Sequence, residues 1–357
     1  RHAAARSWLL VALGLGILLP TTYDSFLWNR LRYLWPFAGP WLIGLVALAD
    51  QLGELAALLT PRLGLVRYAL CAGFASALAA KFPFALRDLA DSSHAISSQH
   101  VELGQWAKRE LPANARIGVN DTGAIAYFSD RPIFDIVGLT TAGEARYWSA
   151  GAGSRFEHYE QLARNTLPTH FIVYPGWFAL PQLLGNCLTE RTVYATILGG
   201  ETMVACEADY ATLGSGEHAT LPEFWGQLPL DAVDVADLDS EAAHGYRVLP
   251  ATQADDVVLS DGVIADGARK NRGHDSFRLR VAPGARFVAR LGADSPVTVN
   301  LRVAGRMLGG FLVVGPSFRE YSVELGADAP NGAVDVEVLA DHGVFSALHY
   351  WLYRARP

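Results

Sequence analysis

Three long apolar segments within the first ninety residues most constrain what this chain can fold into. Residues 7–23 and 33–49 are runs of 17 residues without a charged side chain, and residues 63–86 contain only two basic residues, near the ends. A helix of 17 residues is about 26 Å long at 1.5 Å per residue, close to the roughly 30 Å hydrocarbon core of a bilayer. Residues 1–93 are therefore predicted to hold about three transmembrane helices, in preference to three buried helices of a soluble core.

Basic residues in the short connections indicate the orientation of these helices. Arg1 and Arg6 precede the first segment, and Arg62 and Arg67 lie at the second connection, so these ends are assigned to the cytoplasm. Three crossings then place the long C-terminal region outside. The expected location is a bacterial inner (cytoplasmic) membrane, multi-pass, with an extracytoplasmic C-terminal region and the lipid bilayer as a partner.

The charge of the chain divides near the same place. Residues 1–91 contain eight Lys/Arg and five Asp/Glu, a net of +3, so the remainder must carry −10 to give the total of −7. An acidic region of this kind repels the phosphates of nucleic acids. No nucleic-acid partner is expected.

Residues 94–212 predict a small extracytoplasmic α/β domain, because helical and strand patterns alternate there. A helical stripe ends at Pro112, and several short apolar runs are bounded by turn residues. The predicted strands are 116–119, 132–137 and 170–174, followed by a hairpin of 192–198 and 202–207 that turns at Gly199 and Gly200.

Cysteine spacing leaves one question open in this domain. Cys187 and Cys206 lie on either side of the predicted hairpin, and an extracytoplasmic domain permits a disulfide. A tight hairpin register, however, places Cys206 opposite a residue near Tyr194, which makes the bridge the less favoured alternative. No metal-ligand spacing is present, so no metal site and no cofactor are expected.

The C-terminal third has a different pattern. Residues 213–262 are acidic and contain interspersed prolines, which predicts an extended connecting segment with some edge strands. Residues 263–357 then alternate apolar and polar side chains in at least five runs separated by Gly and Pro turns. This period of two predicts a β-sandwich of the jelly-roll type, so the expected fold is multi-domain: transmembrane helices, a small α/β domain and a C-terminal sandwich.

Catalytic motifs are missing from the sequence, and no catalytic residue is predicted. A first candidate site is the outer loop with Arg30, Arg32 and Tyr33, whose guanidinium groups suit the phosphate of a lipid-linked substrate. The favoured alternative is that these residues are ordinary anchors at the membrane interface.

A second candidate site lies at the ends of the first two predicted strands. Asn120, Asp121 and Asp135 follow or end these strands, where polar side chains can bind ligands. Helix capping by Asn120 and Asp121, and loop-fixing ion pairs of the carboxylates, are the more economical alternatives.

Two stretches resemble bacterial GT-C type glycosyltransferases, membrane enzymes related to protein mannosyltransferases that use polyprenyl-phosphate sugars. Residues 30–36, Arg-Leu-Arg-Tyr-Leu-Trp-Pro, resemble the start of a late transmembrane helix of that family. Residues 106–140, with Asn-Asp-Thr-Gly-Ala-Ile-Ala-Tyr-Phe-Ser-Asp-Arg, are similar to the segment that follows the last membrane helix. The family's catalytic Asp lies in its first outer loop, which this chain does not contain. The resemblance implies the C-terminal, non-catalytic part of such an enzyme, continuing upstream of Arg1, with Arg30 and Arg32 as donor-phosphate contacts.

Two functions from different classes follow. The leading hypothesis is part of a membrane glycosyltransferase that transfers sugar from a polyprenyl-phosphate donor to an envelope glycan or protein acceptor. The alternative is a membrane-anchored glycan-binding or structural protein without enzymatic activity, with Trp225 or Trp351 as exposed binding aromatics. Core packing of those tryptophans is the plain alternative, and a hydrolase built on paired carboxylates is the least favoured reading.

Overall fold

The computed structural model describes residues 38–250, 255–315 and 317–354, together with residues 11, 14–16, 18, 35 and 36. The chain forms two compact units. The first comprises residues 1–96 with 195–198, and the second comprises residues 97–194 with 199–357.

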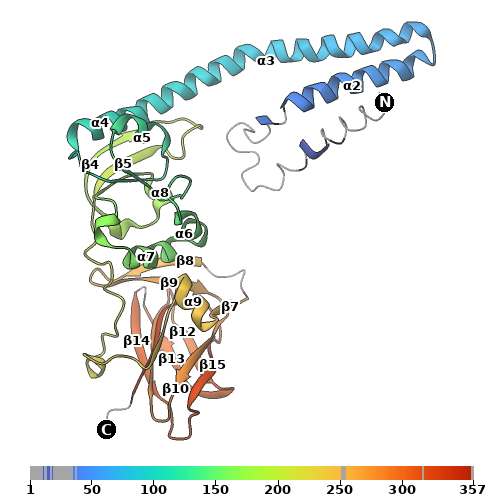
Figure 1. Cartoon of the computed structure of the whole chain (residues 1–357). Helices are drawn as coiled ribbons and strands as arrows, with labels where there is room; N and C mark the ends of the chain where they lie inside the picture. Colours follow the sequence, from blue (N-terminus) through green and yellow to red (C-terminus); the bar gives the residue numbers. More distant parts are fainter. Residues whose placement is uncertain are drawn as a thin grey trace. The chain divides into compact units, whose positions relative to one another are not determined.

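The first unit contains a pair of long helices, α2 (Ala38–Ala57) and α3 (Val66–Ile96), connected through a 3-10 helix at Pro61–Leu65 (Figure 1). Arg67 of α3 donates a hydrogen bond to Asp50 of α2, with 3.2 Å between Nη1 and Oδ1. Large apolar side chains cover much of the remaining helix surface and are exposed, among them Leu55, Phe74, Leu78 and Phe82. Apolar surface of this extent is unfavourable in water and calls for a lipid or protein cover.

One helical stretch, Pro61–Glu110, is long and apolar enough to cross a membrane, and none of its apolar window is buried. Among the described residues no second helix meets the same test, although α2 overlaps the predicted segment at 33–49. The predicted segment at 7–23 falls almost wholly outside the described residues. The multi-pass arrangement therefore stays a prediction.

The second unit begins with an α/β sheet of order β2-β1-β3-β5-β4. β1, β2 and β3 run parallel, and β5 and β4 add an antiparallel hairpin. One apolar cluster lies around Phe171 and another around Ile172, since adjacent residues of a strand point to opposite faces. The elements are a π-helical turn at Ser97–Val101, α4 (Glu102–Glu110), β1 (Ile117–Val119), α5 (Gly123–Ser129), β2 (Ile133–Asp135), α6 (Glu144–Ala150), α7 (Ala152–Gln161), β3 (His170–Val173), α8 (Pro175–Phe178), β4 (Leu184–Thr192) and β5 (Thr202–Ala208).

The hairpin differs from the sequence expectation. The predicted strand at 192–198 is wrong, because β4 ends at Thr192, which pairs with Thr202. Irregularities on either side of Cys187 shift the register of β4 and bring Cys187 opposite Cys206, and the two are joined by a disulfide. The tight register that disfavoured this bridge does not form.

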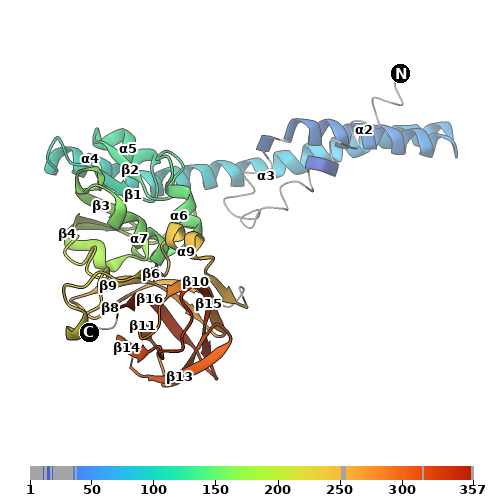
Figure 2. The ribbon, with the colours of Figure 1, turned by 60° about the horizontal axis from the view of Figure 1, so that its bottom comes forward.

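The C-terminal part of the second unit is a β-sandwich, which confirms the β-rich region expected from the period-two pattern (Figure 2). One sheet has the order β13-β12-β15-β10-β7, and the other has β14-β11-β16-β9-β8 with β6 also paired to β16. The strands are β6 (Asp231–Asp234), β7 (Arg247–Leu249), β8 (Asp255–Ser260), β9 (Ala265–Asn271), β10 (His274–Val281), β11 (Arg286–Gly292), β12 (Val297–Val303), β13 (Arg306–Val313), β14 (Phe318–Glu324), β15 (Gly332–Ala340) and β16 (Phe345–Tyr353).

Alternation along the strands builds the core of the sandwich. In β12 the side chains of Val297, Val299, Leu301 and Val303 are buried, while the intervening residues are partly or fully exposed. Facing strands contribute the same way, and the two inner faces form one apolar cluster.

The acidic segment at 213–262 contributes elements to both sheets: β6, β7 and β8, with α9 (Leu238–His244) between β6 and β7. β16 is central. It pairs with β11 along one edge, and along the other with β9 up to Ala347 and then with β6 from His349 onward. All nine residues of β16 are buried, which accounts for its almost continuous apolar sequence.

Candidate functional site

Asn120 follows β1 and is buried between two strand ends. Its Nδ2 donates to the carbonyl of Tyr174 at 3.2 Å, and its Oδ1 accepts from the Tyr174 amide at 3.3 Å. The side-chain amide therefore bridges the end of β1 to the end of β3.

Asp121 is the most accessible of the three predicted ligand-binding residues. One of its carboxylate oxygens lies 3.9 Å from Nδ1 of His100, whose Nε2 is 2.6 Å from the Tyr174 hydroxyl. That hydroxyl donates to Oε1 of Gln99 at 2.7 Å. Burial lowers the pKa of His100, although the Asp121 carboxylate opposes the shift. This polar group ties the π-helical turn to the sheet.

Asp135, at the end of β2, is directed into its own loop. Its carboxylate accepts hydrogen bonds from the amides of Val137, Gly138 and Thr140 and from the Thr140 hydroxyl. The structure thus groups Asn120 and Asp121 around Tyr174 and His100, whereas the carboxylate of Asp135 is used within residues 135–140. Arg30, Arg32 and Tyr33, the predicted donor-phosphate contacts, lie outside the described residues.

The sandwich carries an exposed tryptophan beside a pocket. Trp225 is 67% exposed, and its Nε1 donates to the Thr220 carbonyl at 2.9 Å. The pocket, about 310 Å³, is also lined by polar groups of His218 and Gln227. Beneath it the buried rings of Phe224 and Tyr353 stack with centroids 4.4 Å apart. The indole is thus held at its nitrogen edge while its ring surface faces solvent.

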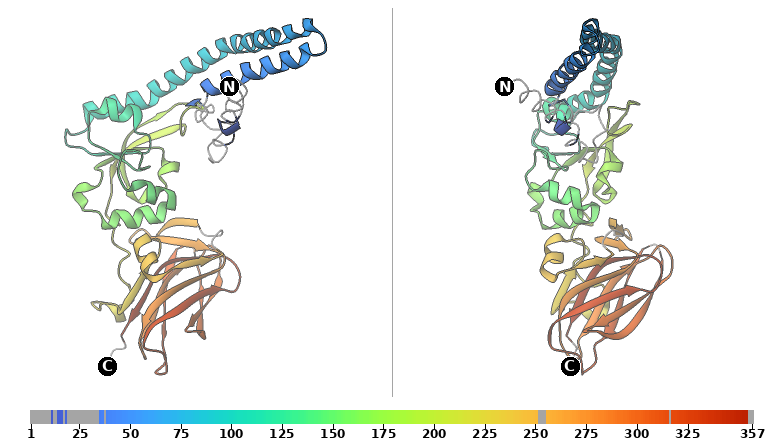
Figure 3. Two further views of the ribbon diagram at one scale, coloured as in Figure 1. Left: turned by 45° about the vertical axis from the view of Figure 1, so that its right-hand side comes forward. Right: turned by 90° about the vertical axis from the view of Figure 1, so that its right-hand side faces the viewer.

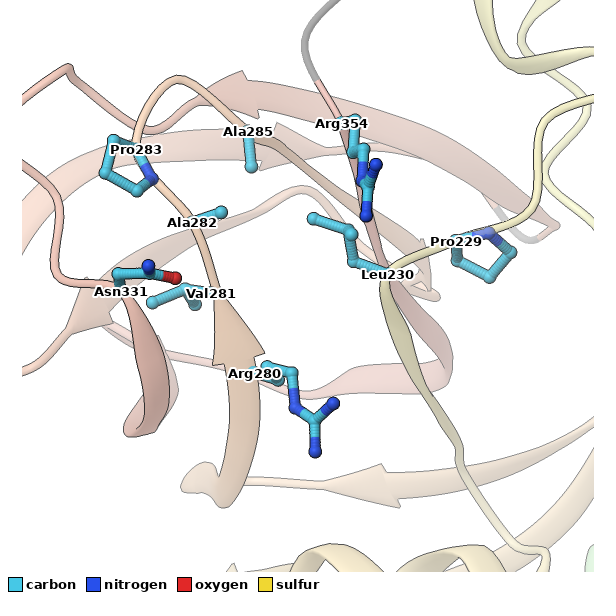
Figure 4. Close-up of a pocket in the computed structure, with 9 residues that line it drawn as sticks. All are labelled: Pro229, Leu230, Arg280, Val281, Ala282, Pro283, Ala285, Asn331 and Arg354. Atoms are coloured by element: carbon cyan, nitrogen blue, oxygen red, sulfur yellow. The ribbon is translucent and has the colours of Figure 1, made fainter.

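A second pocket, about 690 Å³, lies next along the same segments (Figure 4). Arg280 and Arg354 line it, and Figure 4 shows Leu230 between their side chains in this view. Among the described residues neither guanidinium is within 4.0 Å of a carboxylate, and both side chains are exposed. Asn331 supplies an amide to the same pocket.

The two pockets are lined by residues that adjoin in the sequence. The first ends at Leu228 and Tyr353, and the second begins at the adjoining residues Pro229 and Arg354. We call the residues lining both pockets the Trp225 surface. It combines an immobilised aromatic ring with hydrogen-bonding groups and two cations, a set that suits a polar ligand with a flat apolar face.

The other tryptophan singled out by the sequence has a different role. Trp351 is 1% exposed, and its ring stacks on His349 with centroids 4.1 Å apart and on the Arg290 guanidinium at 4.8 Å. Trp351 Nε1 donates to the Glu217 carbonyl at 3.3 Å. It therefore packs beneath the segment that leads to Trp225 and offers no face to a ligand.

Helix α7 packs against β8 and β9, so charged side chains from the α/β sheet and the sandwich meet (Figure 3). Asp256 accepts from the amide and hydroxyl of Ser154, the latter at 2.7 Å, and from Arg269 at 2.7 Å. Arg269 also contacts Glu241 through two hydrogen bonds. A further group in this junction, Asp234, Asp266 and His349, has the residue types and proximity of a metal site.

Comparison with known proteins gives a family only for part of the chain. A domain family of unknown function, DUF8728, matches residues 92–222, less than half of the sequence. A comparison with curated proteins finds no match. The matched range covers the α/β sheet and leaves the sandwich strands outside it.

Several of the solved structures that are similar to part of the chain are carbohydrate-binding modules. The CBM36-1 domain of a xylanase from the hindgut metagenome of Trinervitermes trinervoides is 18% identical over 29% of this chain and 90% of its own, with a TM-score of 0.23. CsCBM6-3 from Clostridium stercorarium, in complex with cellobiose, is 15% identical over 35% and 93%, with a TM-score of 0.26. A module of Cellvibrio mixtus lichenase 5A, in complex with cellotriose, is 9% identical over 36% and 100%, with a TM-score of 0.27. Similarity with identities and TM-scores this low does not show what this chain binds.

Proposed function

We propose that this chain is a membrane-anchored protein that binds a cell-envelope glycan on the Trp225 surface of its sandwich. The observation that carries the proposal is the exposed indole of Trp225, fixed by its hydrogen bond to Thr220 and placed at the rim of a pocket. Because its nitrogen is already hydrogen-bonded, the Trp225 ring leaves its flat apolar face available to a ligand. A flat ring held in place offers contact area without an ordering cost on binding.

The cations of the same surface favour an acidic glycan. Arg280 and Arg354 can each form paired hydrogen bonds with a carboxylate or a phosphate ester. The region after residue 91 carries a net charge of −10, which opposes an acidic ligand at long range. At physiological ionic strength this repulsion is screened beyond about 8 Å, so the two guanidinium groups at the pocket decide the local interaction.

Membrane anchoring rests on α3 and its surroundings. The helix is long, apolar and unburied over its apolar window, and exposed apolar side chains are what a bilayer would cover. The relation to polyprenyl-phosphate-dependent glycosyltransferases stays a prediction, as do multi-pass topology and inner-membrane location. In that setting the sandwich would hold the acceptor glycan.

The test is glycan binding by the full chain in detergent micelles, measured on an array of neutral and acidic envelope glycans. We expect Trp225→Ala to lower the affinity for the bound glycan at least tenfold, about 1.4 kcal/mol. Tyr127→Ala is the matched control, because Tyr127 is an exposed aromatic residue on α5 of the α/β sheet. No retention of any glycan, or equal effects of the two substitutions, would refute the proposal.

A second pair of measurements tests whether the two arginines favour acidic over neutral glycans. Replacing Arg280 and Arg354 together by Gln should reduce binding of acidic glycans and leave neutral ones of the same backbone unchanged. An equal loss of affinity for acidic and neutral glycans would show that the arginines do not discriminate between them.

A further inference from the structure

Three side chains capable of holding a metal ion meet on the outer face of the sheet that contains β16. Asp234 of β6 and His349 of β16 are direct neighbours across the strand pair, and Asp266 comes from β9. One ligand atom from each of the three lies within 4.8 Å of the others. His349 occupies the position where the partner of β16 changes from β9 to β6, so all three strands converge there.

Two of these ligand atoms are buried without a hydrogen bond. Nδ1 of His349 and Oδ1 of Asp234 are 3.6 Å apart, and neither has a hydrogen-bond partner among the described residues. The His349 side chain is only 6% exposed. Buried polar atoms in proteins almost always have a partner, since leaving one unpaired costs about 1–3 kcal/mol. Two unpaired ligand atoms this close together suit a shared cation.

A fourth carboxylate comes from the α/β sheet. Glu157 of α7 is buried, and its Oε1 accepts from the amide of Gly267, the residue after Asp266 in β9, at 2.6 Å. It is bound to the β9 backbone and is not one of the three grouped ligands.

The charges of this group do not balance. Arg290 is fully buried, with Nη1 2.6 Å from Asp266 and Nη2 2.8 Å from Glu320. Four carboxylates (Glu157, Asp234, Asp266 and Glu320) and one guanidinium leave three negative charges if all are ionised. A cation or protons must offset this charge, because isolated buried charges are strongly unfavourable.

The imidazole of His349 is held in one orientation, because it stacks on Trp351 with ring centroids 4.1 Å apart.

We propose that Asp234, Asp266 and His349 bind one divalent transition-metal ion, Zn²⁺ or Mn²⁺, on the outer face of the sheet that contains β16. One imidazole nitrogen with carboxylate oxygens is a ligand set for these ions, whereas Ca²⁺ and Mg²⁺ prefer oxygen alone. Ligand atoms around one such ion are roughly 3 to 4 Å apart, so the atoms here need to close by about 1 Å.

The same ion would stabilise the segment that carries Trp225. Arg290 also donates to the carbonyls of Gly216 and His218, and Glu320 accepts from the amides of Thr220 and Leu221. Metal binding at Asp266 is therefore coupled through Arg290 to the residues just before Trp225. The site does not depend on glycan binding and can be tested without it.

The experiment measures metal content and thermal unfolding of the full chain, purified in detergent without chelator. We expect about one equivalent of Zn²⁺ or Mn²⁺ per chain by plasma mass spectrometry. Stripping with EDTA should lower Tm by several degrees, and added Zn²⁺ or Mn²⁺ should restore it, because a ligand that binds only the folded state raises its stability. Restoration by Ca²⁺ alone would overturn the assignment of a transition metal.

Two matched variants separate the metal site from the charge network. Asp234→Asn removes a ligand, whereas Glu320→Gln removes a carboxylate bound to Arg290 on the side away from Asp266. Of these two variants, only Asp234→Asn should lose bound metal and the response to EDTA. His349→Phe keeps the ring that stacks on Trp351 and should also lose both. The proposal would be overturned if the wild-type protein contained no metal, its Tm did not change with EDTA, and its Tm rose toward acid pH. Protons would then neutralise the buried carboxylates.

Discussion

Glu157 of helix α7 accepts a hydrogen bond from the backbone amide of Gly267 in β9, with 2.6 Å between Oε1 and the nitrogen. This contact joins helix α7, which belongs to the α/β part, to the backbone of the sandwich. It requires glycine at position 267. A Cβ built there would lie 2.5 Å from Glu157 Oε1 and 3.1 Å from the Cβ of Ala236.

Gly267→Ala should therefore destabilise the second unit by roughly 1–3 kcal/mol, the usual range for overpacking a buried site. Thermal unfolding in detergent measures the effect. Gly309→Ala in β13 is the control, since no atom lies within 4 Å of its added Cβ. An unchanged Tm for Gly267→Ala would mean that α7 can move away from β9 without cost.

The two tryptophans named from the sequence should respond in opposite ways to truncation. Trp351→Ala removes a fully buried ring and should cost roughly 3–5 kcal/mol of stability. Trp225→Ala removes an exposed ring and should change stability by less than about 0.5 kcal/mol while reducing glycan binding. Unfolding midpoints of both variants decide this, and a comparable loss of stability for each would contradict the assigned roles.

The disulfide between Cys187 and Cys206 should stabilise the α/β sheet. It closes a loop with a sequence separation of 19, for which the loss of unfolded-state entropy predicts about 3 kcal/mol. Replacing Cys187 by Ser and Cys206 by Ala should lower Tm by several degrees, and dithiothreitol should lower the Tm of the wild type but not of the variant. Equal sensitivity of both proteins to reductant would rule out the bridge in the folded protein.

Asp275 should make stability depend on pH. Its carboxyl is fully buried beside Asn271 and Tyr350, and burial raises its pKa to about 7, although hydrogen bonds from Tyr350 and Asn271 oppose the shift. In the unfolded chain the value is about 3.9. Between about pH 4 and 7 unfolding thus releases a proton, so this group lowers stability as pH rises through that window, by at most about 1.4 kcal/mol per pH unit.

Asp275→Asn removes this titration. We expect the unfolding free energy of the variant to fall less steeply than that of the wild type between about pH 4 and 7, with parallel curves above pH 7.5. Urea unfolding at several pH values measures the difference. Parallel curves over the whole range would show that Asp275 has an ordinary pKa in the folded state.

The strands of the sandwich could be predicted because their signal is local. The alternation at Val297, Val299, Leu301 and Val303 reflects a side-chain period of two, which any half-buried strand must have. The short parallel strands of the α/β sheet were found for a related reason, since each is an apolar run between turn residues.

The register of the hairpin and the contacts of the candidate site residues could not be predicted from local patterns. The register of β4 against β5 depends on irregularities around Cys187 that leave no clear pattern in the sequence. Asp135 and Asn120 were chosen for their positions at strand ends, yet their hydrogen bonds go to the loop at 135–140 and to Tyr174. Composition could not distinguish Trp225 from Trp351, because exposure is a property of the folded chain.

The sequence by itself determined the long apolar helix that begins at Val66 and most strands of the sandwich, because these properties depend on residues only a few positions apart. The tertiary structure alone decided that Asp234, Asp266 and His349 meet. Strand order in the sandwich does not follow chain order, and β16 lies between β11 on one side and β9 and β6 on the other. Strand pairing therefore brings ligand atoms of residues far apart in the sequence within 4.8 Å of one another, which no local pattern encodes.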